Sequence, residues 1–236
     1  MSIELEHTLP LPAGAMLNFA KVNDWLTPIW PTEEASIRDA VAKRQQEFRA
    51  GRSVARRCID QLNTHLGLAI PIGPIDVGLA REPLWPQAVV GSITHTHIDE
   101  QGHCAAIVAP SSMLVGIGLD LEPAQSLSPE VQALVITVQE QQLAQQQLWP
   151  MYWEKYLFSA KESFYKCMFP STRLELDFLD VEFRLFPIID RPDLFKVHID
   201  AVRNDNDYFS QAKLACLNGF VHCRQGLICS IFWLAH

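Results

Sequence analysis

The chain has 236 residues, 48% of them hydrophobic, and a formal net charge of -8. This length and apolar content suffice for a full core, whereas the negative charge argues against nucleic acid as a main partner. The sequence has no apolar run long enough to cross a bilayer, and the segment that begins at Met1 is acidic and lacks the apolar core of a signal peptide. We therefore expect a cytoplasmic protein without a membrane span, and we expect it to be a monomer.

In the first half of the chain, residues 33–66 have a helical pattern that ends at Gly67. A Pro/Gly-rich connection follows at residues 71–74. Short apolar runs bounded by turn residues then predict strands over residues 89–96, 104–109 and 113–122.

In the second half, residues 130–147 predict a glutamine-rich helix with a solvated face, and residues 153–168 predict another helix. Apolar residues recur at helical spacing in the latter and would form a buried stripe. They are Trp153, Leu157, Ala160, Phe164 and Met168. Strands of one sheet are expected over residues 178–186, 195–202, 213–221 and 226–232.

The six cysteines include no C-x-x-C pair and stand in apolar surroundings. This distribution indicates buried, reduced thiols that pack in the core rather than a disulfide framework or a zinc site. The residues are Cys58, Cys104, Cys167, Cys216, Cys223 and Cys229.

Two carboxylates, Asp120 and Glu122, stand at the end of the strand predicted over residues 113–122. Because side chains alternate along a strand, both would point to one face, roughly 7 Å apart, while Leu119 and Leu121 take the other face. Magnesium prefers oxygen ligands, so this spacing is typical of half a magnesium site. A solvated strand edge is the alternative.

Glu162 and Lys166 are four residues apart on the helix predicted over residues 153–168, so they would project from one face. Three carboxylates with a lysine alongside suit a metal-bound diphosphate. The alternative for Glu162 and Lys166 is a surface ion pair, which contributes little to stability. The metal interpretation therefore requires a phosphate-binding element elsewhere in the chain.

An arginine-rich helical stretch upstream offers such an element. Arg49, Arg52 and Arg56 would share one helix face, and guanidinium groups bind phosphate oxygens bidentately. A solvated basic face is the alternative. Further along the chain, Arg81 and His95 flank the strand predicted over residues 89–96.

Five short blocks occur in order along residues 43–166. They are Lys43-Arg44-Gln45 with Glu47-Phe48 and Gly51-Arg52, then Arg81-Glu82-Pro83-Leu84-Trp85-Pro86, Gly91-Ser92-Ile93-Thr94-His95, Gly118-Leu119-Asp120-Leu121-Glu122 and Phe158-Ser159-Ala160-Lys161-Glu162-Ser163. This set resembles the 4'-phosphopantetheinyl transferase family of the enterobactin-synthetase component D type. Leu119, Leu121 and Thr94 depart from the residues common in that family, but none of these changes removes a ligand.

The resemblance implies a transferase that moves the 4'-phosphopantetheine arm of coenzyme A to a serine of an apo carrier protein and releases adenosine 3',5'-bisphosphate. The partner would be an acyl or peptidyl carrier protein of siderophore or secondary-metabolite biosynthesis. The sequence leaves open which carrier is served and whether acyl-coenzyme A is accepted.

The resemblance also implies an α+β fold of two pseudo-duplicated α/β halves with the active site at their interface. Residues 1–115 would form the N-terminal half, which holds the nucleotide of coenzyme A. Residues 116–236 would form the C-terminal half, which carries the metal carboxylates and the catalytic helix.

The same resemblance assigns the site residues. Asp120, Glu122 and Glu162 would hold magnesium (Mg²⁺) against the diphosphate of coenzyme A. Lys166 and His95 would each contact a phosphate oxygen, and Glu162 would act as base, as metal ligand or as both.

The coenzyme A site implied by the resemblance extends further. Arg44 and Arg52 would meet the 3'-phosphate, Arg81 would lie near the adenine, and Thr94 would belong to the same site. Arg49 and Arg56 have no assigned role.

A second chemistry is suggested by His95, His97 and Asp99, which resemble the His-x-His-x-Asp-His run of binuclear metallo-hydrolases. Glu100 stands in place of the last histidine, and a zinc site needs about three or four well-placed ligands. A third possibility is a non-catalytic scaffold that binds carrier proteins. Such a scaffold has no reason to keep three carboxylates and a lysine together, so we favour the transferase.

Overall fold

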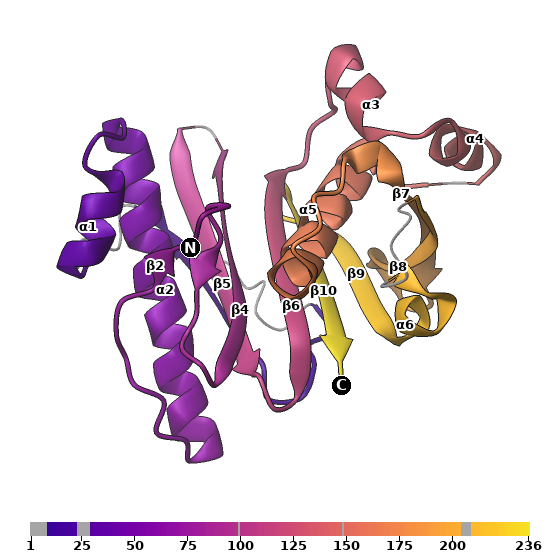
Figure 1. Ribbon diagram of the computed structural model, residues 1–236. Coiled ribbons are helices and arrows are strands. Elements are labelled where there is room, and N and C mark those ends of the chain that lie inside the picture. The colour runs from indigo at the N-terminus through magenta and orange to yellow at the C-terminus, as the bar shows by residue number, and fades with distance from the viewer. Residues whose placement is uncertain (1–8, 23–28, 99, 148, 204–208) are drawn as a thin grey trace.

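The structure is a computed structural model and describes residues 9–22, 29–98, 100–147, 149–203 and 209–236 (Figure 1). Helices and strands are mixed along the chain in an α+β fold, as expected. Within the described ranges, no helix is both long and apolar enough to cross a membrane.

The N-terminal part of the chain folds around one small sheet. Its elements are β1 (Met16–Lys21), α1 (Pro31–Ile37), α2 (Ala42–Leu66), β2 (Asp76–Val77), β3 (Pro83–Leu84), β4 (Val89–Ile98) and β5 (Gln101–Pro110). Strands β1, β5 and β4 pair antiparallel in that order, and α2 covers the sheet with Val54, Cys58 and Leu62 facing it. Helix α2 ends at Gly67, whose left-handed φ of 63° terminates the helix as predicted.

The single helix expected over residues 33–66 is wrong, because residues 38–41 separate α1 from α2. Neither proline nor glycine stands at the break. Two acidic residues of α1 form ion pairs with α2, Glu33 with Arg56 and Glu34 with Arg49. Tertiary contacts therefore favour a second short helix that lies against α2 over a continuation of one helix.

The C-terminal part of the chain folds around a larger sheet. Its elements are β6 (Leu114–Pro123), α3 (Pro129–Val135), α4 (Val138–Gln146), α5 (Trp153–Thr172), a 3-10 turn (Phe178–Asp180), β7 (Val181–Ile188), β8 (Arg191–Val202), α6 (Gln211–Cys216), β9 (Leu217–Arg224) and β10 (Leu227–Ala235). The five strands pair antiparallel in the order β6-β10-β9-β8-β7, and α5 lies across one face of the sheet (Figure 1).

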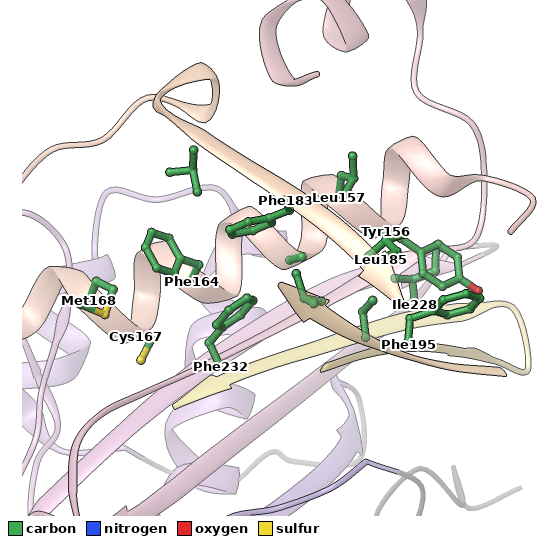
Figure 2. Packing of buried hydrophobic residues seen from close by; sticks show 14 of the residues in the cluster. Tyr156, Leu157, Phe164, Cys167, Met168, Phe183, Leu185, Phe195, Ile228 and Phe232 are labelled. Atoms are coloured by element: carbon green, nitrogen blue, oxygen red, sulfur yellow. The ribbon is translucent and has the colours of Figure 1, made fainter. Parts of the chain in front are cut away.

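The apolar stripe predicted on α5 is confirmed. Leu157, Ala160, Phe164 and Met168 are buried, whereas Trp153 packs at the margin of the same cluster. Figure 2 shows Phe164 of α5 facing the strands, and its ring centroid lies 5.7 Å from that of Phe183 and 5.6 Å from that of Phe232. These aromatic contacts fix α5 on the sheet.

Four further expectations need correction. Residues 130–147 form two helices, because the side chain of Thr137 accepts the backbone N–H of Glu140 and starts α4 with a capping box. Residues 178–180 form a 3-10 turn before β7 begins, and residues 213–216 belong to α6 rather than to a strand. Among the cysteines, Cys216 is exposed and Cys223 half-buried, while the other four are buried and all six are free thiols.

The two parts of the chain share an apolar layer between their sheets. Leu17 and Ile107 of the smaller sheet pack with Leu119, Leu121 and Ile231 of the larger sheet. At the border, the hydroxyl of Ser92 on β4 donates to the carbonyl oxygen of Leu119 on β6 over 3.4 Å. The polar residues at the ends of β4 and β6 are thereby brought together.

Candidate active site

Asp120 and Glu122 lie on β6 with the orientation that strand alternation predicts. Leu119 and Leu121 are fully buried in the layer between the sheets, and the two carboxylates lie near lysines of α5. A Cβ atom added to Gly118 would stand 1.9 Å from the carbonyl oxygen of Ser163. The missing side chain therefore lets β6 touch the backbone of α5 and places Asp120 beside that helix.

Lys166 of α5 is the centre of the carboxylate cluster. Its Nζ lies 2.6 Å from Oδ1 of Asp120 and 3.9 Å from Oε2 of Glu162. The hydroxyl of Thr94 on β4 donates to the same Oδ1 over 3.2 Å. The predicted residues Thr94, Asp120, Glu162 and Lys166 thus come together from β4, β6 and α5.

Asp120 is almost fully buried, and its two oxygens differ. Oδ1 has two donors, whereas Oδ2 is buried without a hydrogen-bond partner in the described part of the chain. A buried carboxylate oxygen left without a partner is costly, so it marks a position for a further ligand.

Lys155 is a site residue that the sequence analysis did not assign. Its Nζ lies 3.1 Å from Oε2 of Glu122. Lys155 precedes Glu162 by seven residues, which is about two helical turns, so the spacing alone placed it on the same face of α5. The two lysines Lys155 and Lys166 therefore face the carboxylates from one helix.

The environment shifts the pKa values of this cluster. Burial raises the pKa of Glu162, and the ammonium of Lys166 opposes this effect. Burial also raises the pKa of Glu122, with a further contribution from Asp120 and opposition from Lys155. For Lys166, burial lowers the pKa, but Asp120 and Glu162 outweigh it and the net shift is upward.

The arginines of α2 separate into two groups. Arg49 donates two hydrogen bonds of 2.8 Å to Glu34, and Arg56 lies 2.6 Å from Glu33, so both tie α2 to α1. Arg52 is buried, with its Nε donating to the carbonyl oxygen of Ile75 over 2.9 Å. Burial lowers the pKa of Arg52 to about 10. The charge of Glu33 opposes this effect, and the charge of Arg44 adds to it.

Arg44 and His95 meet at a buried carboxylate, Glu47, to which the sequence analysis gave no role. Nε2 of His95 lies 2.6 Å from the guanidinium of Arg44 and 2.9 Å from Oε2 of Glu47. Nδ1 of His97 lies 3.5 Å from Oε1 of Glu47. Burial lowers the pKa of His95, Glu47 opposes this, and the charges of Arg44 and Lys166 lower it further.

Two cavities border Glu162. The first, of about 220 Å³, lies between the two parts of the chain. Its walls include Arg81, Trp85, Ile93, Glu162, Lys166 and Phe169. The second, of about 130 Å³, is lined by apolar residues such as Phe164 and Phe178 and, besides Glu162, by the charged residues Lys161 and Asp177. An ion pair between Glu82 and Arg173 joins the loop before β3 to the end of α5 beside the first cavity.

The residues of the hydrolase alternative do not form a metal cluster. His95 and His97 both face Glu47, while Asp99 lies outside the described residues. More generally, among residues 9–22, 29–98, 100–147, 149–203 and 209–236 no group of three His, Cys, Asp or Glu side chains is arranged to hold a metal ion. This includes Asp120, Glu122 and Glu162, whose carboxylates face Lys155 and Lys166 in this structure.

Two family models match the chain. The 4'-phosphopantetheinyl transferase N-terminal domain matches residues 32–109, and the 4'-phosphopantetheinyl transferase superfamily matches residues 116–218.

Curated relatives agree with the family models. The 4'-phosphopantetheinyl transferase Svp of Streptomyces mobaraensis is 35% identical over 184 residues, which cover 75% of this chain and 70% of the relative. The 4'-phosphopantetheinyl transferase PptT of Mycobacterium tuberculosis is 35% identical over 156 residues, or 66% of this chain and 64% of the relative. Enterobactin synthase component D of Salmonella typhimurium is 31% identical over 141 residues, or 58% of this chain and 54% of the relative. The chain therefore belongs to the 4'-phosphopantetheinyl transferase superfamily, whose enzymes transfer the phosphopantetheine arm of coenzyme A to carrier proteins.

Proposed function

We propose that this chain transfers the arm in a magnesium-dependent reaction and releases adenosine 3',5'-bisphosphate, with Asp120, Glu122 and Glu162 as the residues that would hold the metal. The buried Oδ2 of Asp120, which has no partner in the described part of the chain, is the observation that carries the proposal. Carboxylate oxygens are the ligands that magnesium prefers. When bound, the ion would supply positive charge to the diphosphate of coenzyme A.

Lys155 and Lys166 are proposed to hold the carboxylates in place. Nζ of Lys155 lies 3.1 Å from Glu122 and Nζ of Lys166 lies 2.6 Å from Asp120, so each ammonium orients one carboxylate. Lys166 also faces the larger cavity, where it would donate to a phosphate oxygen of the diphosphate. Transfer of a phosphoryl-type group depends mainly on such positioning and charge stabilisation.

Glu162 is proposed as the base that takes the proton from the carrier serine. Its raised pKa, caused first by burial, makes its carboxylate a better proton acceptor than an exposed glutamate. Glu162 borders both cavities, so coenzyme A in the larger one and an acceptor side chain at the smaller one could both reach it. Whether Glu162 also serves as a metal ligand is tested below.

The nucleotide of coenzyme A is proposed to bind to Arg44, Arg52, Arg81 and His95, with Thr94 at the border of the site. Arg44 supports this assignment because its side chain is half exposed and held beside His95. Neutral His95, with a pKa lowered by burial, would donate one hydrogen bond to a phosphate oxygen.

The division into residues 1–115 and 116–236 is part of the proposal. It is supported by the two family models, since one ends at residue 109 and the other begins at residue 116. The similarity to enterobactin synthase component D supports a role in siderophore or secondary-metabolite biosynthesis. A cytoplasmic location and a monomeric state stay predictions from the sequence.

The direct test is incubation of the chain with coenzyme A, magnesium and a panel of apo carrier proteins, followed by intact mass measurement of each carrier. We expect one carrier to gain the mass of one phosphopantetheine arm, and a carrier with its acceptor serine changed to alanine to gain none. Chelation of magnesium should stop the reaction. A folded chain that binds coenzyme A but modifies no carrier, with or without magnesium, would refute the proposal.

A further inference from the structure

Lys161 precedes Glu162 in the chain and borders the same smaller cavity, but its ammonium points into the protein. Its side chain is 2% exposed. Its Nζ donates to the carbonyl oxygen of Val135 over 2.8 Å, to Oε2 of Glu140 over 2.8 Å and to the carbonyl oxygen of Phe178 over 2.9 Å. Since an ammonium group has three N–H donors, these three acceptors satisfy it completely.

Glu140 is likewise fully buried and fully bonded. Its Oε1 accepts the backbone N–H of Phe183 over 2.9 Å, and its Oε2 accepts the backbone N–H of Thr137 over 2.9 Å as well as Lys161. The pair therefore connects α5 to the end of α3, the start of α4, the 3-10 turn and β7 at one point.

A buried ion pair is a poor way to stabilise a fold, because the desolvation of both charges offsets much of their attraction. Burial lowers the pKa of Lys161 and raises the pKa of Glu140, so each charge is opposed by its surroundings. To the aromatic packing that fixes α5 on the sheet, these three short directional bonds add a restraint on the rotation of α5 about its axis.

That rotation matters for Glu162, because its own side chain is held loosely. Its shortest ion-pair distance is the 3.9 Å to Lys166. The direction in which Glu162 points therefore depends on the helix that carries it. On the other side of α5, the contact between Gly118 and the backbone of Ser163 and the hydrogen bonds of Ser230 to Ser159 and Ser163 hold the helix against β6 and β10. The Glu140–Lys161 pair holds it from the side of α3, α4 and β7.

We propose that Lys161, held by Glu140, is a positioning residue for Glu162, which sets the angle at which this carboxylate meets the acceptor serine. The inference rests on the proposed function, in which Glu162 acts on the serine. It assigns to the Glu140–Lys161 pair an effect on turnover that is separate from its effect on stability.

Three variants test this separation: Lys161→Met, Glu140→Gln and the double variant. The single Lys161→Met change leaves Glu140 buried without its cation and should destabilise the protein. The double variant removes both charges, so its urea midpoint should return toward that of the wild type. We expect kcat to stay reduced about 10-fold to 100-fold in the double variant, since a small misplacement of a catalytic group has such an effect. The KM for coenzyme A should change less than about 2-fold.

Arg184→Met serves as a control, because it removes an ion pair with Asp200 on the strands β7 and β8, away from Glu162. Its kcat should equal that of the wild type. A double variant with both stability and kcat restored would show that the pair is merely structural and would overturn the inference. If Glu162 does not act on the serine, Glu162→Gln will leave turnover unchanged. That result would contradict the proposed function itself and is therefore distinguishable from a failure of this inference alone.

Discussion

Lys166 binds only one of the two oxygens of Asp120: its Nζ lies 2.6 Å from Oδ1, while Oδ2 is buried and has no hydrogen-bond partner among the described residues. The ion pair joins α5 to β6, and the second oxygen remains available to a metal ion. Oδ1 therefore has a structural role, and Oδ2 is the oxygen for which we propose a role in the reaction.

Asp120→Ala should abolish transfer because it removes a proposed metal ligand. The fold should persist with reduced stability, because Lys166 loses its partner at 2.6 Å. We expect turnover to fall at least about 10²-fold, as when a charge-stabilising group is removed from an active site. Turnover should be measured by carrier mass in saturating magnesium, and circular dichroism should match the wild type. Near wild-type turnover under these conditions would contradict the assignment of Asp120 as a metal ligand.

Glu162→Gln keeps the size of the side chain but removes its charge. If Glu162 takes the serine proton, kcat should fall about 10²-fold to 10⁴-fold while the affinity for coenzyme A changes little. Calorimetric titration with coenzyme A and with magnesium measures the two affinities. A loss of magnesium affinity as large as the loss of turnover would instead make Glu162 chiefly a metal ligand.

Dephospho-coenzyme A, which lacks only the 3'-phosphate, tests the proposed clamp. Wild type should bind it about 10-fold to 150-fold more weakly than coenzyme A, whereas Arg52→Ala should bind both ligands about equally. Arg44→Ala should lose discrimination in the same way, and its half-exposed side chain makes it the less disruptive change. Calorimetric titration of both ligands against the wild type and each variant gives a double-difference cycle. Arg57→Ala, at an exposed arginine of the same helix, controls for general attraction between basic residues and the ligand. Undiminished discrimination in Arg52→Ala would mean that Arg52 does not contact this phosphate.

Gly118→Ala should separate β6 from α5. The added Cβ would lie 1.9 Å from the carbonyl oxygen of Ser163 and 2.6 Å from the backbone nitrogen of Cys167, so backbone must move. We expect a loss of about 1 to 3 kcal/mol in the free energy of unfolding together with reduced turnover. Gly73→Ala is the matched control, since no heavy atom lies within 4 Å of its added Cβ. Equal urea midpoints for the two variants would contradict the close approach.

Stability should fall in mild acid because of His222. This side chain is fully buried on β9, and burial lowers its pKa from 6.5 to about 4. Between these two values the unfolded chain binds a proton that the folded chain does not, so stability is present above pH 6.5 and is lost as the pH falls toward 4. At about pH 5 the loss from this residue should be about 2 kcal/mol. Urea unfolding should show a correspondingly smaller loss in His222→Gln, and an identical loss would refute the assignment.

Local periodicity was sufficient to predict that several residues of the candidate site lie close together. The period of two along β6 places Asp120 and Glu122 together, and the period of 3.6 along α5 places Glu162 near Lys166. The pairing of Glu47 with His95 joins residues 48 positions apart, so no local pattern reveals it. The same holds for Lys155 and Glu122, although the position of Lys155 on its helix face was visible.

The wrong predictions of helices and strands have different physical reasons. The break between α1 and α2 depends on ion pairs that Glu33 and Glu34 form with α2, and sequence pattern alone contains no stop signal there. The break at Thr137 was readable, because Thr137 and Glu140 have the spacing of a capping box. The short helix α6 has apolar residues that fit a strand equally well, so tertiary packing decides its form.

The layer in which Leu119 and Leu121 pack against Ile107 also limits how relatives can exchange parts. Each sheet alone would present an apolar face to water, so a chimaera that joins the N-terminal part of one protein to the C-terminal part of another must match these hidden faces. Conserving every charged residue of the site would not be enough. Compatibility between the parts is therefore decided by residues buried in this layer rather than by the charged residues of the candidate site.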